Sequence, residues 1–462
     1  IIGFPRVGSL RELKFASEKY FRGEISAEEL QNTAKKLRST HWQLQQENGI
    51  SLIPVNDFSF YDNMLDTAVL LNAVPERYRA LSLSPLDTYF AMARGYQGEH
   101  GDVKAFAMKK WFNTNYHYMV PEIEDTTEIR LAGEKPFAEY AEAKALGVPA
   151  KLVLIGPFTF LKLARFTGEK ALSDFVEDTV KAYCDYLEKL NELGATWAEL
   201  DEPYLVKDLS AEDIALFTQI YKTVLAAKGN VKVLLQTYFG DVRDCYSEIT
   251  ALNFDGIGLD FTEGKQTMAL VQKNGFPKEK ILFAGVVNGK NIWRNSYEKT
   301  LKILLRPVCG DIVLNTSCSL LHVPYTLRNE TKLAESYQKH FAFAEEKLEE
   351  LAELSQICAS AQPQATEAYQ KNQQLFCEDR HCSNAEVQRK VAALTEADFV
   401  RKPAFAEREK IQQETFQLPP LPTTTIGSFP QTKEVRANRA AFRKGEISEE
   451  QYVDFNKKQI AD

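Results

Sequence analysis

The sequence predicts an α/β protein that consists of a (β/α)8 TIM barrel, a linker and the truncated start of a second, duplicated barrel. Two observations lead to this prediction. Short apolar runs rich in Val, Ile and Leu alternate with helical patterns, which is typical of a parallel sheet covered by helices on both faces. A long motif near the start of the chain also recurs near its end, as expected when a domain has been duplicated.

The apolar runs provide candidates for the eight strands of the barrel. They are Ile1–Phe4, Ser51–Val55, Lys151–Ile155, Trp197–Leu200, Val231–Gln236, Gly256–Asp260, Ile281–Val287 and Ile312–Asn315. Glu128–Leu131 is a candidate for a ninth strand. Helical patterns separate most of the runs, and eight strand–helix units favour a closed barrel over a doubly wound sheet. No glycine-rich phosphate loop follows any run, which argues against a nucleotide-binding Rossmann domain.

The recurring motif marks the start of each predicted domain. Its first copy comprises Ile2-Gly-Phe-Pro5, Arg11-Glu-Leu-Lys14 and Gly23-Glu-Ile-Ser26. Its second copy comprises Ile426-Gly-Ser-Phe-Pro430, Lys433-Glu-Val-Arg436 and Gly445-Glu-Ile-Ser448, at nearly the same spacing. The second copy reaches Asp462 after what the pattern indicates is its first helix. We therefore predict a barrel over residues 1–358, an interdomain linker over 359–421 and the start of a second barrel over 422–462.

The first helix is predicted from capping-box spacing at Ser9-Leu-Arg-Glu12. This start would place Arg11 and Lys14 on one outer face of the helix. The inward-facing residues would be Leu13, Ala16 and Tyr20. Cations in a first turn oppose the helix dipole, so the two side chains either lie in solvent or receive an external anion.

A second capping box, Ser26-Ala-Glu-Glu29, predicts a helix that reaches about Asn48. Its counterpart in the second copy of the motif is Ser448-Glu-Glu-Gln451. The two copies are therefore expected to fold alike locally.

Composition restricts the classes of partner and compartment. A net charge of −8 and a pI near 5.6 argue against binding to nucleic acid or to an anionic membrane surface. No apolar run approaches the roughly 18 residues of a membrane span, and the first residues lack a signal-peptide pattern. Seven cysteines without framework spacing indicate a reducing environment, so we expect a cytoplasmic location.

Several acidic residues follow the predicted strands, where barrel enzymes carry their chemistry. The acids at these ends are Asp57, Asp62, Asp201, Glu202 and Asp260. Paired carboxylates in such positions could serve a glycosidase, or they could be hydrogen-bonded structural groups.

Two groups of cysteine and histidine residues have a sequence spacing that is compatible with metal ligands. Cys318 and His322 could join such a site, but no second pair completes it, which favours a structural role. Cys377 and Cys382 flank His381 in a polar linker and give a weaker indication.

The longest motifs resemble those of the cobalamin-independent methionine synthase family, and the resemblance covers the whole chain. The motifs that carry it are Ile2-Gly-Phe-Pro-Arg-Val-Gly8, Arg11-Glu-Leu-Lys14, Lys110-Trp-Phe-Asn-Thr-Asn-Tyr-His-Tyr118, Asp201-Glu-Pro203, Asn291-Ile-Trp-Arg294, Ser317-Cys-Ser-Leu-Leu-His-Val-Pro324 and Leu421-Pro-Thr-Thr-Thr-Ile-Gly-Ser-Phe-Pro430. The resemblance implies two (β/α)8 barrels that face each other across an extended linker. It further implies methyl transfer from 5-methyltetrahydropteroyltriglutamate to L-homocysteine, without cobalamin and with zinc holding the homocysteine thiolate.

The resemblance also implies binding residues, position by position. Those for folate are Arg11, Glu12, Leu13, Lys14 and Lys110. Those for homocysteine or methionine are Ile426, Gly427 and Ser428. The zinc ligands and the proton-donating histidine of the family would fall after Asp462, so no catalytic residue and no metal ligand is expected in this chain. The expected partners are the two small substrates, and the expected oligomeric state is a monomer.

Three functions therefore stay open from the sequence. The chain could be a piece of a zinc methyltransferase that is inactive by itself, or a non-catalytic folate-binding module. A stand-alone barrel hydrolase that uses Asp57, Asp201, Glu202 or Asp260 is the third alternative.

Overall fold

The computed structural model describes residues 1–304, 310–377, 383–425, 427–428 and 430–461. The chain divides into two compact units, Ile1–Glu378 and Asp379–Asp462, and each is considered by itself. The weaker metal candidate is the group Cys377, His381 and Cys382. Of these three, His381 and Cys382 lie outside the described residues, whereas Cys377 is exposed.

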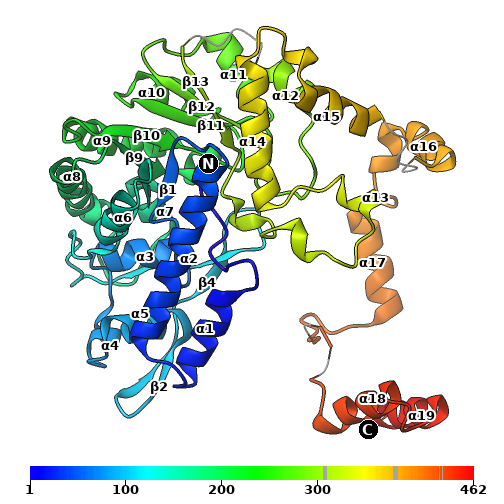
Figure 1. Ribbon diagram of the computed structural model, residues 1–462. Coiled ribbons are helices and arrows are strands. Elements are labelled where there is room, and N and C mark those ends of the chain that lie inside the picture. The colour runs from blue at the N-terminus through cyan, green and yellow to red at the C-terminus, as the bar shows by residue number, and fades with distance from the viewer. Residues whose placement is uncertain (305–309, 378–382, 426, 429, 462) are drawn as a thin grey trace. The chain divides into compact units, whose positions relative to one another are not determined.

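The first unit is built on a seven-stranded parallel sheet that curls into a half-barrel (Figure 1). Its strands, in spatial order, are β1 (Ile53–Val55), β7 (Ala150–Ile155), β9 (Trp197–Asp201), β10 (Lys232–Gln236), β11 (Gly256–Asp260), β12 (Ile281–Val287) and β13 (Ile312–Thr316). All neighbouring pairs are parallel. The seven corresponding apolar runs were predicted to within two residues at either end, because buried parallel strands need continuous apolar sequence.

The prediction of a strand at Ile1–Phe4 is wrong. This segment is buried, but its backbone groups bond to side chains and a loop instead of a strand. The Ile2 N–H donates to Thr316 Oγ1 at 3.3 Å, and the Phe4 N–H donates to Asp57 Oδ2 at 2.8 Å. Because Thr316 ends β13 and Asp57 follows β1, the segment lies between the two edge strands.

Glu128–Leu131 is not a strand either. Its backbone follows the end of α3 (Asn63–Leu70), where the Arg130 N–H donates to the Leu71 carbonyl at 3.2 Å. The Glu128 carbonyl accepts from Asn72 Nδ2 at 2.8 Å. These bonds with a helix end leave the segment outside the sheet.

Helices follow most strands and pack apolar faces on the sheet. They include α2 (Ala27–Glu47), α6 (Lys135–Ala145), α7 (Pro157–Leu163), α8 (Val176–Glu192), α9 (Ala211–Ala226), α10 (Tyr246–Ala251), α11 (Thr267–Asn274), α12 (Tyr297–Leu304) and α14 (Ala344–Ala359). In α8 the buried side chains of Tyr183, Tyr186, Leu187 and Leu190 recur at helical spacing. Among the described residues, no helix combines the length and apolar character needed to cross a membrane.

The connection between β1 and β7 is long and carries extra elements. It contains α4 (Glu76–Arg79), α5 (Pro85–Arg94), the hairpin of β2 (Tyr96–Gly98) and β3 (Gly101–Val103), and the hairpin of β4 (Met108–Lys110) and β5 (His117–Met119). This insertion places Lys110 on a hairpin outside the main sheet.

The predicted capping box at Ser26 is confirmed, but the one at Ser9 is wrong. The Ser26 side chain accepts from the Glu29 N–H at 3.1 Å, and Glu29 accepts from the Ser26 N–H at 2.8 Å. By contrast, α1 (Glu12–Phe21) begins after Arg11, which adopts a left-handed conformation with a φ of 65° and makes no side-chain cap.

The turn before α1 explains this difference. The Glu12 carboxylate bends back to accept from the Leu10 N–H at 3.0 Å. A Cβ on Gly8, whose φ is +84°, would lie only 2.0 Å from Glu12 Oε2, so this turn requires glycine. Arg11 therefore precedes the helix and does not share a helix face with Lys14.

The second unit is helical over its described residues. Its helices are α16 (Ala385–Ala392), α17 (Phe405–Phe416), α18 (Lys433–Arg443) and α19 (Glu449–Ala461). The predicted second copy of the capping box is confirmed, since Gln451 accepts from the Ser448 N–H at 2.9 Å and the Ser448 hydroxyl accepts in return at 3.2 Å. The rings of Phe442 and Tyr452 stack at 4.6 Å between α18 and α19.

A buried ion pair between β7 and β9 yields a test of the fold. Lys151 and Glu199 are 2% and 0% exposed at their side chains and contact each other directly. We expect Glu199→Gln to lower the free energy of unfolding by about 3–5 kcal/mol, because it leaves a buried ammonium without a counter-charge. Urea denaturation followed by circular dichroism measures the loss.

Two controls define this test. The double variant Lys151→Met/Glu199→Leu removes both charges and should lose less stability than the single variant. Glu298→Gln removes one partner of the exposed Lys302–Glu298 pair on α12 and should cost at most about 1 kcal/mol. A double variant as unstable as Glu199→Gln would contradict the role of the pair.

Candidate functional site

Side chains from several strand ends meet in a narrow cavity of about 50 Å³, here called the mouth cavity. Its polar and charged lining comprises Arg6, Asp57, Asp62, Asn63, His117, Asp201, Ser319 and His322, and its aromatic lining comprises Trp111, Tyr116, Tyr118 and Tyr238. Of the predicted acids, the structure brings Asp57, Asp62 and Asp201 together here. Parallel strands place their carboxyl ends at one edge, so loops far apart in sequence converge.

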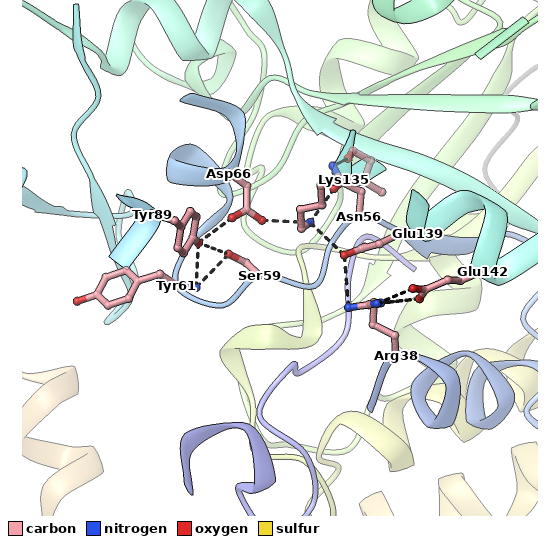
Figure 2. A network of polar contacts seen from close by, with 10 residues as sticks. Arg38, Asn56, Ser59, Tyr61, Asp66, Tyr89, Lys135, Glu139 and Glu142 are labelled. Carbon is pink, nitrogen blue, oxygen red and sulfur yellow. Dashed lines mark hydrogen bonds and ion pairs between the residues drawn. The ribbon is translucent and has the colours of Figure 1, made fainter. Parts of the chain in front are cut away.

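A polar network fixes the loop after β1 that carries Asp57 and Asp62 (Figure 2). Asn56, with a φ of 72°, donates from Nδ2 to the Val153 carbonyl at 2.8 Å. Lys135 of α6 donates to Asn56 Oδ1 at 2.7 Å. Lys135 also forms ion pairs with Asp66 at 3.1 Å and Glu139 at 3.4 Å.

The same network extends into the surrounding helices. Arg38 of α2 pairs with Glu139 at 3.6 Å. Tyr89 of α5 donates to Asp66 at 2.7 Å and accepts the Tyr61 N–H at 3.1 Å. Helices on both sides thus hold the loop in one conformation.

Burial dominates the electrostatics of the mouth cavity. It raises the pKa of Asp62 to about 7, although the N–H groups of Leu65 and Met119 hydrogen-bond to the carboxylate. Burial and the neighbouring Glu199 raise the pKa of Asp201 well above its ordinary value. The pKa of His322 falls to about 4 because the ring is buried, with Lys290 and Arg6 adding to the effect.

Asp201 is the acid with unused hydrogen-bonding capacity. Tyr238 donates to its Oδ2 at 3.1 Å, whereas no donor among the described residues reaches the buried Oδ1, and the neighbouring Glu199 hydrogen-bonds with Asp201 when Asp201 is protonated. A cavity of about 50 Å³ has room for a water molecule, and a water there could satisfy this oxygen.

Glu202 and Asp260 are held in structural roles and do not line the mouth cavity. Glu202 accepts from the N–H groups of Phe158 and Thr159, at 3.0 and 2.7 Å, and so caps the start of α7. Asp260 accepts from the N–H groups of Phe239, Thr262 and Glu263 at 2.8–3.1 Å. The hydrolase alternative therefore loses two of its four proposed acids.

A second cavity, of about 330 Å³, has a basic lining and is here called the basic cavity. It is lined by Lys109, Lys110, Phe112, Tyr118, Lys162, Leu163, Ala164, Tyr204 and Lys207. The lysines come from strand β4, from helix α7 and from the residue after η2 (Pro203–Val206). Tyr118 lines both cavities, so the basic cavity adjoins the mouth cavity.

Sequence reasoning identified Lys110 but missed the other three lysines. Lys162 and Lys207 both lie shortly after strands β7 and β9, which is the signal that could have indicated them. Their convergence with a hairpin from the β1–β7 insertion is a tertiary feature.

The four predicted folate residues of the first motif differ in environment. Leu13 is 4% exposed and packs with Ala34, Leu37 and Phe58, so it is a core residue. Glu12 bonds to the backbone of its own turn. Arg11 is exposed, and the exposed Lys14 lies 3.8 Å from Glu18. Neither cation lines the basic cavity, and a common surface with Lys110 remains a prediction.

The three predicted amino-acid-binding residues lie in the second unit. Ile426 falls outside the described residues. Gly427 has a φ of +87°, a conformation that favours glycine, and Ser428 is exposed.

The described part of the chain contains no group of three or more His, Cys, Asp or Glu side chains that could hold a metal. Cys318 is buried, and burial strongly raises its thiol pKa, which disfavours the thiolate that binds zinc. His322 packs against the rings of Tyr116 and Phe239 at 5.3 and 5.5 Å. Two such side chains are fewer than the three or four protein ligands of a zinc site.

The raised pKa of Asp62 predicts a pH effect on stability. Its pKa is about 7 when folded and about 3.9 when unfolded, so stability is highest below the lower value and declines as pH rises through 7. We expect the free energy of unfolding of Asp62→Asn to fall by up to about 4 kcal/mol less over this pH range than that of the unaltered protein. Urea denaturation between pH 4 and 8 measures the slopes, and Asp185→Asn on the surface of α8 should leave the slope unchanged.

Comparison with known proteins places the chain in a family. Residues 1–308 match the N-terminal domain of the cobalamin-independent synthases, and residues 421–462 match their catalytic domain. The chain is 58% identical over 460 residues to the 5-methyltetrahydropteroyltriglutamate–homocysteine methyltransferase of Streptococcus gordonii, and 57% identical to that of Streptococcus sanguinis. Each alignment covers 100% of this chain and 61% of the relative, so the chain spans about three fifths of their length.

Solved structures support the fold at low sequence identity. A B12-independent methionine synthase from Shewanella sp. W3-18-1 superimposes with a TM-score of 0.51 at 15% identity, covering 72% of this chain and 90% of that one. A counterpart from Listeria monocytogenes gives a TM-score of 0.53 at 15% identity, covering 78% and 96%. These structures show the fold alone. The family-model matches and the relatives of 57–58% identity show that the chain belongs to the cobalamin-independent methionine synthase family.

Proposed function

We propose that this chain is the folate-binding part of a zinc-dependent methyltransferase. The enzyme would transfer a methyl group from 5-methyltetrahydropteroyltri-L-glutamate to L-homocysteine and form L-methionine, without cobalamin. The observation that carries this proposal is the position of Lys110, a residue expected to bind folate, in a cavity lined by three further lysines. A triglutamate tail is a chain of carboxylates, for which ammonium groups are suitable partners.

The proposal assigns a part to each region. Residues 1–358 form the folate-binding barrel, closed as a (β/α)8 structure, 359–421 form the linker, and 422–462 begin the catalytic barrel. Arg11 and Lys14 act with Lys110 on the folate, whereas Glu12 and Leu13 hold their turn and helix in place. Ile426, Gly427 and Ser428 bind homocysteine or methionine. The protein acts as a monomer in the cytoplasm.

Zinc has no suitable site among the described residues, so the proposal places its ligands, and the proton-donating histidine, outside this chain. When bound, zinc lowers a thiol pKa from about 8.5 so that homocysteine reacts as a thiolate. The contribution of this chain is to bind and orient the methyl donor through its tail.

The first prediction of this proposal concerns activity. We expect the purified 462-residue chain, supplied with zinc and both substrates, to form no methionine, because its described residues provide no metal site. A full-length relative at the same concentration serves as the positive control. Methionine formation by the chain above the no-enzyme rate would contradict the proposal.

The second prediction concerns the folate tail. In the full-length protein, Lys14→Ala and Lys110→Ala should each weaken binding of the triglutamate substrate by about two- to fivefold, the effect of one exposed ion pair. Binding of the monoglutamate should change less, and added salt should reduce the difference. Isothermal titration calorimetry provides the affinities. Lys19→Ala, on the same helix as Lys14, is the matched control, and an unchanged triglutamate-to-monoglutamate ratio would refute these roles.

A further inference from the structure

The mouth cavity brings ionisable groups of both signs into one small space. Its lining includes the guanidinium of Arg6 and the carboxyl groups of Asp57, Asp62 and Asp201. None of these residues is among those proposed to bind folate or homocysteine, and none lines the basic cavity. The mouth cavity is therefore a candidate for a binding site of its own.

Arg6 has hydrogen-bonding capacity that the protein does not use. Its Nη2 donates to the Tyr61 carbonyl, and its guanidinium carbon lies 5.7 Å from the centre of the Tyr116 ring. Within the described part of the chain, no carboxylate forms an ion pair with it. A guanidinium is a planar fork of N–H donors that matches a carboxylate in a bidentate manner. Arg6 therefore provides one half of a site, the half that receives a carboxylate.

His322 lies on the same side of the cavity as Arg6. Its ring centre is 5.3 Å from that of Tyr116, the ring that Arg6 also contacts. Its Nδ1 is buried and has no hydrogen-bond partner among the residues that the structure describes. A buried polar atom without a partner is costly, so a polar ligand at this position is favoured over an apolar one.

Asp201 provides the opposite charge. It is 3% exposed, and Tyr238 donates to its Oδ2 at 3.1 Å. No donor of the described residues reaches its Oδ1, which leaves the acid Glu199 as the neighbour with which it can share a proton. An ammonium group would supply both the positive charge and the N–H donors that Asp201 lacks.

The remaining walls and the size of the cavity suit a small ligand with an ammonium group. The aromatic side chains of Trp111, Tyr116, Tyr118 and Tyr238 line it, and the faces of aromatic rings attract ammonium groups. One water-sized group needs about 10–15 Å³, so a cavity of about 50 Å³ holds a few such groups. The ammonium group, the α-carbon and the carboxylate of an amino acid are of this size.

We propose that the mouth cavity binds the head group of an α-amino acid, with the carboxylate at Arg6 and His322 and the ammonium group at Asp201. The two charges of an amino acid are joined through one carbon atom, so a ligand short enough for this cavity satisfies both sides at once. A side chain on that carbon can extend past His117, which is exposed and lines the cavity. This site goes beyond the proposed function, because it uses none of the residues assigned to either substrate.

The experiment measures binding of glycine, which is the head group alone, to the 462-residue chain by saturation-transfer difference NMR. Glycine should bind saturably. Acetate and methylamine each carry only one of its two charges, and each should bind about tenfold more weakly, because one set of charge-assisted hydrogen bonds is lost.

Substitutions locate the site. Arg6→Met and Asp201→Asn should each raise the Kd for glycine about tenfold, because each removes the partner of one charge. Arg130→Met and Asp178→Asn change exposed residues outside the lining and should leave the Kd unchanged. Ser428→Ala should also leave it unchanged, which separates this site from the residues proposed to bind homocysteine.

Glycine that binds no more tightly than acetate or methylamine would overturn the inference, and so would an unchanged Kd for Arg6→Met or for folded Asp201→Asn. If Asp201→Asn does not fold, the comparison of glycine with acetate tests the ammonium half by itself. Loss of glycine binding in Ser428→Ala would also overturn the inference and assign the binding to the second unit. The methionine assay and the Lys14 and Lys110 substitutions test the proposed function separately, and their failure would leave this site unaffected.

Discussion

The parallel pairing of all seven main strands is the constraint on which the other features of the first unit depend. In a sheet of this kind, residues at and just after the carboxyl ends of the strands are placed to form a site. The same pairing brings every carboxyl end to one edge. Residues as distant in sequence as Asp57, Asp201 and His322 therefore line one cavity.

Burial then gives the two neighbouring cavities opposite electrostatic character. In the mouth cavity, burial raises the pKa values of Asp62 and Asp201 and lowers the pKa of His322, so it favours the neutral form of each side chain over its charged form. In the basic cavity, Lys109, Lys110 and Lys207 are exposed and Lys162 is half-buried. The lysines of the basic cavity thus lie next to a cavity lined mainly by acidic, histidine and aromatic side chains, and Tyr118 forms part of the wall of both.

Membership of the family is supported by sequence much more strongly than by superposition. The streptococcal relatives are 57–58% identical across the chain, whereas the solved structures share 15% identity and show the fold alone. The chain spans 61% of the length of these relatives.

The sequence by itself determined the seven strands β1, β7, β9, β10, β11, β12 and β13 of the main sheet, and the caps at Ser26 and Ser448, because these depend on local patterns of apolar and capping residues. It also determined the family, through its long motifs. The predictions from sequence were wrong at Ile1–Phe4 and at Ser9. There the side chains of Asp57 and Glu12 accept hydrogen bonds from nearby backbone N–H groups, whereas the local patterns predicted a strand and a capping box. Only the tertiary structure decided that Lys162 and Lys207 join Lys110 around one cavity, since three separate segments must converge there. Convergence of this kind is set by strand order and packing, which leave no local signature in the sequence.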